Sequence, residues 1–191
     1  YVLENLISTI KFKEITPSLI SQIESISNIT QELNSYSRPS VTKEKVDLNE
    51  CILSAINLFG SAEGVTINYT SPQNNCYTIG EKTLFIRIFN NLIKNAVQSF
   101  YNKENGIIDI SLKQENDKYI VSIEDNGCGI KDENKSKIFT PNFTTKANGG
   151  GIGLTIVKTI LESYACDITF KSKENIGTIF FLIFPAMQED K

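Results

Sequence analysis

The sequence predicts an α+β protein in which a mixed α/β domain follows a helical segment. Isoleucines recur at helical spacing from Ile20 to Leu33, which favours helices near the start of the sequence. After Pro39 the pattern changes, and stretches with the period of strands alternate with stretches with the period of helices. We therefore expect two parts, a helical segment in residues 1–40 and an α/β domain in residues 41–191.

Two apolar stripes in residues 1–40 predict a helical hairpin. One stripe runs from Val2 to Ile10 and the other from Ile20 to Leu33, and a polar connection separates them. Two helices of this kind usually pack into a bundle. The alternative is a solvated tail, which would leave an isoleucine exposed at every third position.

Composition narrows the class of protein. The net charge of −3, with acidic and basic residues interspersed, disfavours a nucleic-acid partner, which would need a basic face. The longest apolar run, residues 178–187, is about half the length of a membrane helix, so we expect membrane contact only through segments outside this chain. Four scattered cysteines fit a reduced, cytoplasmic protein. With no histidine in the sequence, catalysis by a resident histidine base or nucleophile is excluded.

Local patterns after Ser40 predict the order of elements in the α/β domain. Asp47 followed by Glu50 is typical of a capped helix start, and Asn116-Asp117 between two alternating runs is typical of a hairpin turn. In order, we expect helix 47–59, strand 65–69, helix 81–101, hairpin strands 108–112 and 119–123, a loop over 129–151, helix 152–163, and strands 167–172 and 178–185. Such a long loop favours a lid or a disordered segment.

The helix predicted over residues 81–101 carries the first candidate motif. Asn91, Asn95 and Gln98 share one face, whereas apolar residues such as Phe89 and Ile93 cover the other. Side-chain amide oxygens are suitable ligands for Mg²⁺, which is completed by waters and substrate phosphates. Taken alone, two asparagines on a helix are more often a solvated face.

The second candidate motif is the run Asp125-Asn126-Gly127-Cys128-Gly129, which directly follows a predicted strand. A buried carboxylate at Asp125 would accept a hydrogen bond from an exocyclic amine such as that of adenine. Glycines at 127 and 129 would let the backbone approach a flat ligand. The alternative is an ordinary tight turn, since these are common turn residues.

The third candidate motif is a glycine cluster, Gly149-Gly150-Gly151-Ile152-Gly153-Leu154, that runs into a predicted helix. Backbone N–H groups at a helix start bind phosphate oxygens. Lys146, just upstream, would add a point charge on a terminal phosphate. The alternative is a flexible hinge.

Together, and in this order, the motifs closely resemble those of the histidine-kinase branch of the GHKL ATPase superfamily, which has the Bergerat fold. The resemblance covers residues 81–178 through five motifs: the N box at 91–96, the first glycine box at 125–129, the F box at 138–141 with 143–146, the second glycine box at 149–154, and the closing Gly177-Thr178. Residues 27–39 are also similar to the second helix of the family's dimerisation and phosphotransfer hairpin.

This resemblance implies a two-layer α/β sandwich that binds ATP and Mg²⁺. By the same resemblance, Asn95 holds Mg²⁺ with help from Asn91, Asp125 binds the adenine amine, and Lys146 contacts the γ-phosphate from a lid. The implied catalytic residues are therefore Asn91, Asn95 and Lys146. The remaining implied nucleotide contacts are Lys94, Gly127, Gly129, Ile130, Phe139, Thr145, Gly149, Gly150, Gly151, Ile152, Gly153, Leu154 and Thr178.

The resemblance further implies a protein histidine kinase that transfers the γ-phosphate of ATP to a histidine, from which it is relayed to an aspartate of a response regulator. Because this chain has no histidine, we expect the acceptor upstream of it. We also expect a homodimer and the cytoplasmic portion of a membrane-anchored sensor. Many relatives carry glycines near Tyr164-Ala165-Cys166, so this turn departs from the family pattern.

Two alternatives remain open. One is an ATP-hydrolysing relative of the same fold, but those proteins use a glutamate at the position of Asn91 to activate water, and an asparagine cannot take a proton. The other is a non-catalytic dimerisation or interaction module with a vestigial site. Absence of nucleotide binding would favour that module.

Overall fold

The computed structural model describes residues 43–60, 64–71, 75–100, 105–146 and 151–187. The predicted helical hairpin in residues 1–40 lies outside these ranges. Apart from Thr145 and Lys146, the described residues belong to one compact unit, Val41–Thr144 together with Gly151–Lys191.

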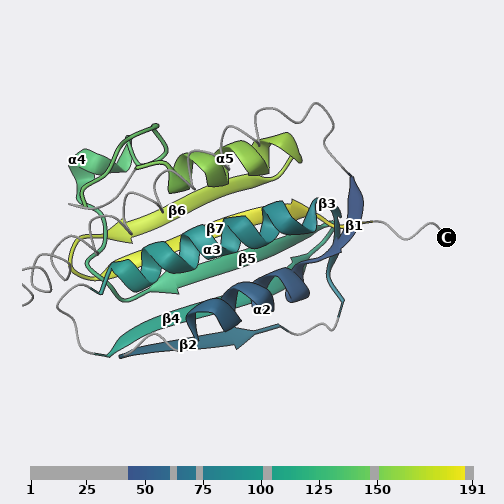
Figure 1. Ribbon diagram of the computed structural model, residues 1–191, viewed down its shortest axis with the longest axis horizontal. Helices are drawn as coiled ribbons and strands as arrows, with labels where there is room; N and C mark the ends of the chain where they lie inside the picture. Colours follow the sequence, from purple (N-terminus) through teal and green to yellow (C-terminus); the bar gives the residue numbers. More distant parts are fainter. Residues whose placement is uncertain (1–42, 61–63, 72–74, 101–104, 147–150, 188–191) are drawn as a thin grey trace, which may run out of the picture. The chain divides into compact units, whose positions relative to one another are not determined.

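A five-stranded mixed sheet with the strand order β2-β4-β5-β7-β6 forms one layer of the domain (Figure 1). β2 runs parallel to β4, and the other neighbours are antiparallel. The bounds are β2 Val65–Thr70, β4 Gly106–Glu115, β5 Lys118–Asp125, β6 Asp167–Lys173 and β7 Gly177–Pro185. The predicted hairpin is confirmed: β4 and β5 pair across Asn116, whose φ of 55° is one that asparagine tolerates.

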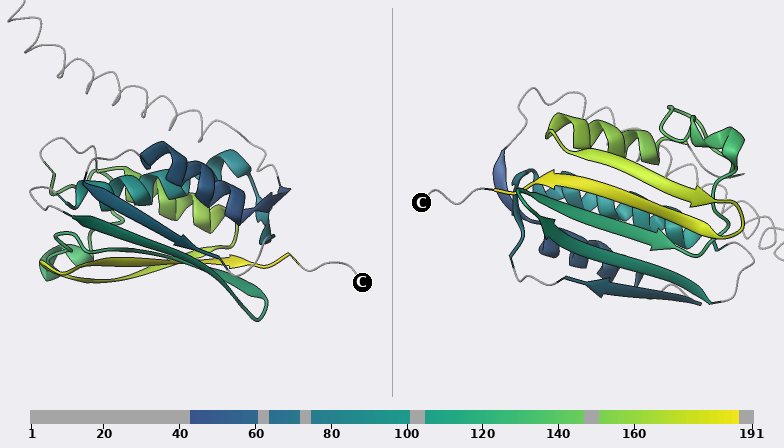
Figure 2. Two further views of the ribbon diagram at one scale, coloured as in Figure 1. Left: turned by 90° about the horizontal axis from the view of Figure 1, so that it is seen from below. Right: turned by 180° about the vertical axis from the view of Figure 1, so that it is seen from behind.

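The second layer consists of helices on one face of this sheet (Figure 2). They are α2 (Leu48–Phe59), α3 (Lys82–Gln98) and α5 (Gly153–Ser163), and the predicted two-layer architecture is confirmed. Asp47 caps α2, since its Oδ1 accepts from the Asn49 backbone N–H at 2.9 Å. None of the helices in the described part of the chain is long and apolar enough to cross a membrane.

Three details differ from the sequence prediction. A small antiparallel pair of strands, β1 (Glu44–Asp47) and β3 (Tyr77–Gly80), was not predicted. The expected loop over residues 129–151 contains a single helical turn, α4 (Asp132–Lys135), in which Lys135 and Asp132 form an ion pair of 2.6 Å. The helix expected to reach residue 101 ends at Gln98. Two backbone bonds close its last turn: the Ser99 N–H donates to the Ala96 carbonyl at 3.0 Å and the Phe100 N–H to the Val97 carbonyl at 3.3 Å.

An aromatic cluster in the core fixes α3 on the sheet. Phe85 and Phe89 of α3 and Phe184 of β7 are fully buried. The ring of Phe85 lies edge-on to Phe184 at 5.3 Å and to Tyr164 at 5.4 Å. Since this face of α3 is held in the core, the opposite face, with Asn91 and Asn95, is turned away from the sheet.

Replacing Phe85 by alanine should lower the free energy of unfolding by about 3–5 kcal/mol, because the substitution removes a fully buried ring and leaves a cavity. Leu58→Ala on α2 is the matched control: its side chain is 67% exposed, and we expect a change below about 0.5 kcal/mol. Urea denaturation followed by circular dichroism measures both. Equal effects would contradict the packing described here.

Candidate functional site

Asn91 and Asn95 lie one helical turn apart on α3, and both are half-buried. The side-chain N–H of Asn91 donates to the backbone carbonyl of Arg87 at 2.9 Å. A Cβ atom built on Gly153, the first residue of α5, would lie 3.0 Å from Asn91 Oδ1. The structure therefore brings the first predicted motif next to the third. Lys94, on the same helix, is exposed.

Asp125 ends β5 and is only 7% exposed. Its Oδ1 accepts from the Gly127 backbone N–H at 2.9 Å and lies 3.0 Å from the hydroxyl of Ser99. The backbone carbonyl of Ser99 in turn accepts from the N–H of Cys128 at 3.1 Å. The carboxylate is thus held between its own glycine-rich loop and the end of α3.

The turn between β6 and β7 packs backbone to backbone against the glycine-rich loop after β5. A Cβ atom on Gly129 would overlap the carbonyl of Lys173, and one on Gly177 would overlap the carbonyl of Asp125. The N–H of Asn175 donates to the Cys128 carbonyl at 2.7 Å. Neither glycine can carry a side chain without displacing this contact.

Thr178 lies directly opposite Asp125 in the pairing of β5 with β7, and it is buried. Its Oγ1 lies 2.9 Å from the hydroxyl of Ser172, which also accepts from the backbone N–H of Ile130 at 2.8 Å. Three predicted site residues, Asp125, Ile130 and Thr178, therefore meet at one end of the sheet.

The amino end of α5 follows Gly151, which packs near residues 142–143. Ile152 is the N-cap residue, and no side chain caps the helix, so its first N–H groups are suited to bind phosphate oxygens. Gly151, with a φ of 66°, packs against the backbone of Asn142 and Phe143. Leu154, like Ile152, is half-buried.

Phe139 of the predicted F box is half-buried between α5 and β6. Its ring lies edge-on to Phe170 at 6.0 Å, its backbone carbonyl accepts from Thr155 Oγ1 at 3.3 Å, and Lys158 Nζ lies 5.7 Å from the ring centre. These contacts pack Phe139 against the domain.

Four predicted lid residues fall outside the part of the chain in which the site can be described. Thr145 and Lys146 are exposed and belong to the other compact unit, which groups Thr145–Gly150 with Tyr1–Ser40. Gly149 and Gly150 lie outside the described residues. Their phosphate contacts stay predictions.

The chemistry of α3 fits a magnesium ion held partly by phosphates. In the described ranges no group of three or more cysteine, aspartate or glutamate side chains could hold a metal ion. Asn91 uses its amide N–H for the Arg87 carbonyl, which leaves its oxygen as the atom beside Gly153. Amide oxygens completed by substrate phosphates and water are a usual Mg²⁺ environment.

Sequence reasoning missed the residues that brace the site. The Ser99 hydroxyl contacts Asp125, and the Ser172 hydroxyl contacts Ile130 and Thr178. Asn126 forms two hydrogen bonds with Ile107 of β4. Its side-chain Oδ1 accepts from the Ile107 backbone N–H at 2.9 Å, and its backbone N–H donates to the Ile107 carbonyl at 3.2 Å. No local pattern marks Ser99 or Ser172, because Asp125 and Ile130, with which they bond, lie far along the chain. Asn126 stands within the second motif, but its partner on β4 is also distant in sequence.

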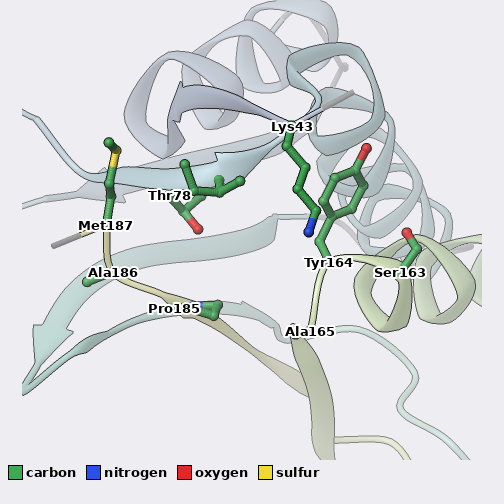
Figure 3. A pocket seen from close by; sticks show the side chains of 9 residues that line it. Lys43, Thr78, Ser163, Tyr164, Ala165, Pro185, Ala186 and Met187 are labelled. Carbon is green, nitrogen blue, oxygen red and sulfur yellow. The ribbon is translucent and has the colours of Figure 1, made fainter. Parts of the chain in front are cut away.

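A separate pocket of about 330 Å³ lies at the other end of the domain (Figure 3). It is lined by Lys43, Thr78, Ile79, Ser163, Tyr164, Ala165, Pro185, Ala186 and Met187. It adjoins the carboxyl ends of α5 and β7, whereas the predicted motifs adjoin their amino ends. The pocket contains none of the predicted site residues.

The chain belongs to the histidine kinase-, DNA gyrase B- and HSP90-like ATPase family, whose profile matches residues 80–188. This membership supports ATP as the ligand of the domain.

The curated proteins to which the chain is similar include sensor histidine kinases, as the sequence resemblance predicted. The signal transduction histidine-protein kinase AtoS of Escherichia coli K12 is 34% identical over 178 residues, which are 87% of this chain and 28% of AtoS. The sensor histidine kinase ZraS of Salmonella typhimurium is 28% identical over 184 residues, 93% of this chain and 39% of ZraS. The chain thus spans well under half the length of these curated relatives.

Solved structures give the same family and confirm the Bergerat fold. The catalytic domain of histidine kinase ThkA matches with a TM-score of 0.67 and 30% identity, over 75% of this chain and 95% of that one. ThkA in complex with the response regulator protein TrrA matches with a TM-score of 0.71 and 26% identity, over 87% of this chain and 48% of that one.

Gly129→Ala should destabilise the domain more than Gly64→Ala. Both glycines have a positive φ, 65° and 74°, so each substitution costs about 1–2 kcal/mol for the left-handed backbone. Only at Gly129 does the new methyl group overlap a backbone carbonyl, whereas nothing lies within 4 Å of a methyl group at Gly64. Thermal unfolding of the two variants measures the difference. Equal losses in melting temperature would contradict the close contact between the loop and the β6–β7 turn.

Proposed function

We propose that this chain is the ATP-binding, phosphate-transferring part of a two-component sensor histidine kinase. The observation that carries the proposal is the arrangement along α3. Asn91 lies beside the first residue of α5, and Ser99, just after the helix, contacts Asp125. The eight residue steps from Asn91 to Ser99 correspond to about 12 Å along the helix, a length that separates a site for phosphates from a site for a base.

At the base end, Asp125 accepts a hydrogen bond from the exocyclic amine of adenine. A nearly buried carboxylate suits this role, because a charge-assisted bond is strong where water is excluded. Thr178 lies opposite it on β7. Gly127, Gly129 and Ile130 form the backbone and the apolar surface along which the flat base lies.

At the phosphate end, Asn95 would hold Mg²⁺ with help from Asn91, and the bound ion would supply positive charge beside the phosphates of ATP. The uncapped start of α5, at Gly153 and Leu154, donates backbone N–H groups to phosphate oxygens. By family resemblance, Lys146 contacts the γ-phosphate, and the list of nucleotide contacts is completed by Lys94, Phe139, Thr145, Gly149, Gly150, Gly151 and Ile152. Phosphoryl transfer requires mainly positioning and charge stabilisation, which these groups supply.

The phosphate acceptor is a histidine outside these residues, because the chain contains none. The next acceptor is an aspartate of a response-regulator receiver domain, a partner class supported by the complex of the similar kinase ThkA with TrrA. We further propose that the whole protein is a homodimer whose catalytic part lies on the cytoplasmic side of a membrane-anchored sensor.

Asn91 favours transfer over hydrolysis. A hydrolase of this fold needs a general base at this position to activate water, and an amide cannot accept the proton. The bond from the Asn91 N–H to the Arg87 carbonyl also fixes the side chain in place. It therefore orients groups without activating a water molecule.

The purified chain should bind a non-hydrolysable ATP analogue with micromolar affinity in calorimetry, and binding should weaken when Mg²⁺ is removed. Asn95→Ala should abolish the Mg²⁺ dependence, because it removes the proposed metal ligand. Asn68→Ala is the control: Asn68 is exposed on β2 and bonds Asp109 at 2.8 Å, away from the site. Absence of binding in the unchanged protein would favour a non-catalytic module. If the Asn95→Ala variant keeps the Mg²⁺ dependence of binding, the metal role is excluded.

With labelled ATP, the chain alone should acquire no acid-labile phosphate, since it has no histidine. A separately expressed helical segment that carries an acceptor histidine should become labelled when the chain is added. The Asn95→Ala variant should not label it. Steady release of inorganic phosphate without labelling of the segment would identify a hydrolase instead.

A further inference from the structure

We propose that Ser99 is a positioning residue that holds the carboxylate of Asp125 and thereby sets the preference for adenine. This inference rests on the proposed function, since it concerns the same site. Ser99 is the residue that closes α3, and neither the sequence motifs nor the comparisons assign it a role. Its side chain and its backbone both contact the loop that carries Asp125.

The hydroxyl of Ser99 has two acceptors and one proton. It lies 2.6 Å from the Ala96 carbonyl and 3.0 Å from Asp125 Oδ1. The Gly127 N–H donates to the same carboxylate oxygen at 2.9 Å. When the Ser99 proton is directed to Asp125, two donors share one oxygen and fix the rotation of the carboxylate plane, which decides where its other oxygen points.

Packing around Ser99 leaves its hydroxyl little room to move. A Cβ atom on Gly127 would overlap the Ser99 hydroxyl and would lie 2.8 Å from Asp125 Oδ1. The absence of a side chain at Gly127 therefore creates the space that the hydroxyl fills. The backbone bond from Cys128 to the Ser99 carbonyl, 3.1 Å long, closes the same junction from the other side.

This junction connects the two ends of the proposed nucleotide site. Asn91 and Asn95 lie on α3, and Ser99 directly follows that helix. Because a helix is rigid over this distance, Ser99 sets the position of the adenine-binding carboxylate relative to the asparagines. Without the hydroxyl, Oδ1 would lose one of its donors at this junction, and the carboxylate would be less well oriented for the amine of adenine.

The test compares ATP with purine riboside triphosphate, which lacks the amine that Asp125 would bind. In calorimetry with Mg²⁺, Ser99→Ala should weaken the affinity for ATP about fivefold to tenfold. This is the size of effect expected when one hydrogen bond to the Asp125 carboxylate is lost. It should weaken the second nucleotide by less than about twofold, because its binding does not use the carboxylate. The ratio of the two affinities should therefore fall. Ser99→Cys, which nearly keeps the volume and donates weakly, should behave in the same way.

Ser163→Ala is the matched control. Ser163 closes α5 with a hydroxyl bond of 2.7 Å to the Ile160 carbonyl, the same geometry as Ser99 with Ala96, but far from Asp125. Its variant should leave the affinity ratio unchanged. Equal weakening of both nucleotides by Ser99→Ala would show a merely structural role and overturn the inference. Unchanged affinity for both nucleotides would overturn it as well. If the unchanged protein binds neither nucleotide, the proposed function itself fails.

Discussion

The candidate site depends on the close contact between two stretches of backbone, the loop after β5 and the turn between β6 and β7. Gly129 lies against the Lys173 carbonyl and Gly177 against the Asp125 carbonyl, so each stretch contributes a glycine where the other contributes an oxygen. The Asn175–Cys128 hydrogen bond joins them. Since Asp125 and Thr178 border this contact, larger side chains at either glycine would separate the residues proposed to recognise the base.

The two ends of the site differ in how their polar groups are satisfied. Burial of the Asp125 carboxylate would be costly without partners, and the Gly127 N–H and the Ser99 hydroxyl offset that cost within the protein. This end is therefore organised before a ligand arrives, which reduces the ordering needed on binding. The start of α5 has no side-chain cap, so its N–H groups are better satisfied by a phosphate than by the protein itself.

The sequence predicted the parts that follow from local patterns. The β4–β5 hairpin depends on an Asn116-Asp117 turn and a period of two, and α3 on an apolar face, so both were predicted correctly. β1 and β3 are four residues each and pair across a long stretch of chain, which leaves no local signal. The same reason hides Ser99 and Ser172, whose partners lie 26 and 42 residues away.

The thiols of the domain core are not candidates for covalent phosphate chemistry. Burial raises the pKa of Cys51 and of Cys166 to about 12, so both stay protonated and unreactive near neutral pH. Asn91 cannot act as a base, and the chain has no histidine. Under the proposed function, the domain orients ATP, and the nucleophile is a histidine on another segment. A site made of amides, one carboxylate and glycine backbone is therefore suited to present a phosphoryl group to an acceptor on another segment.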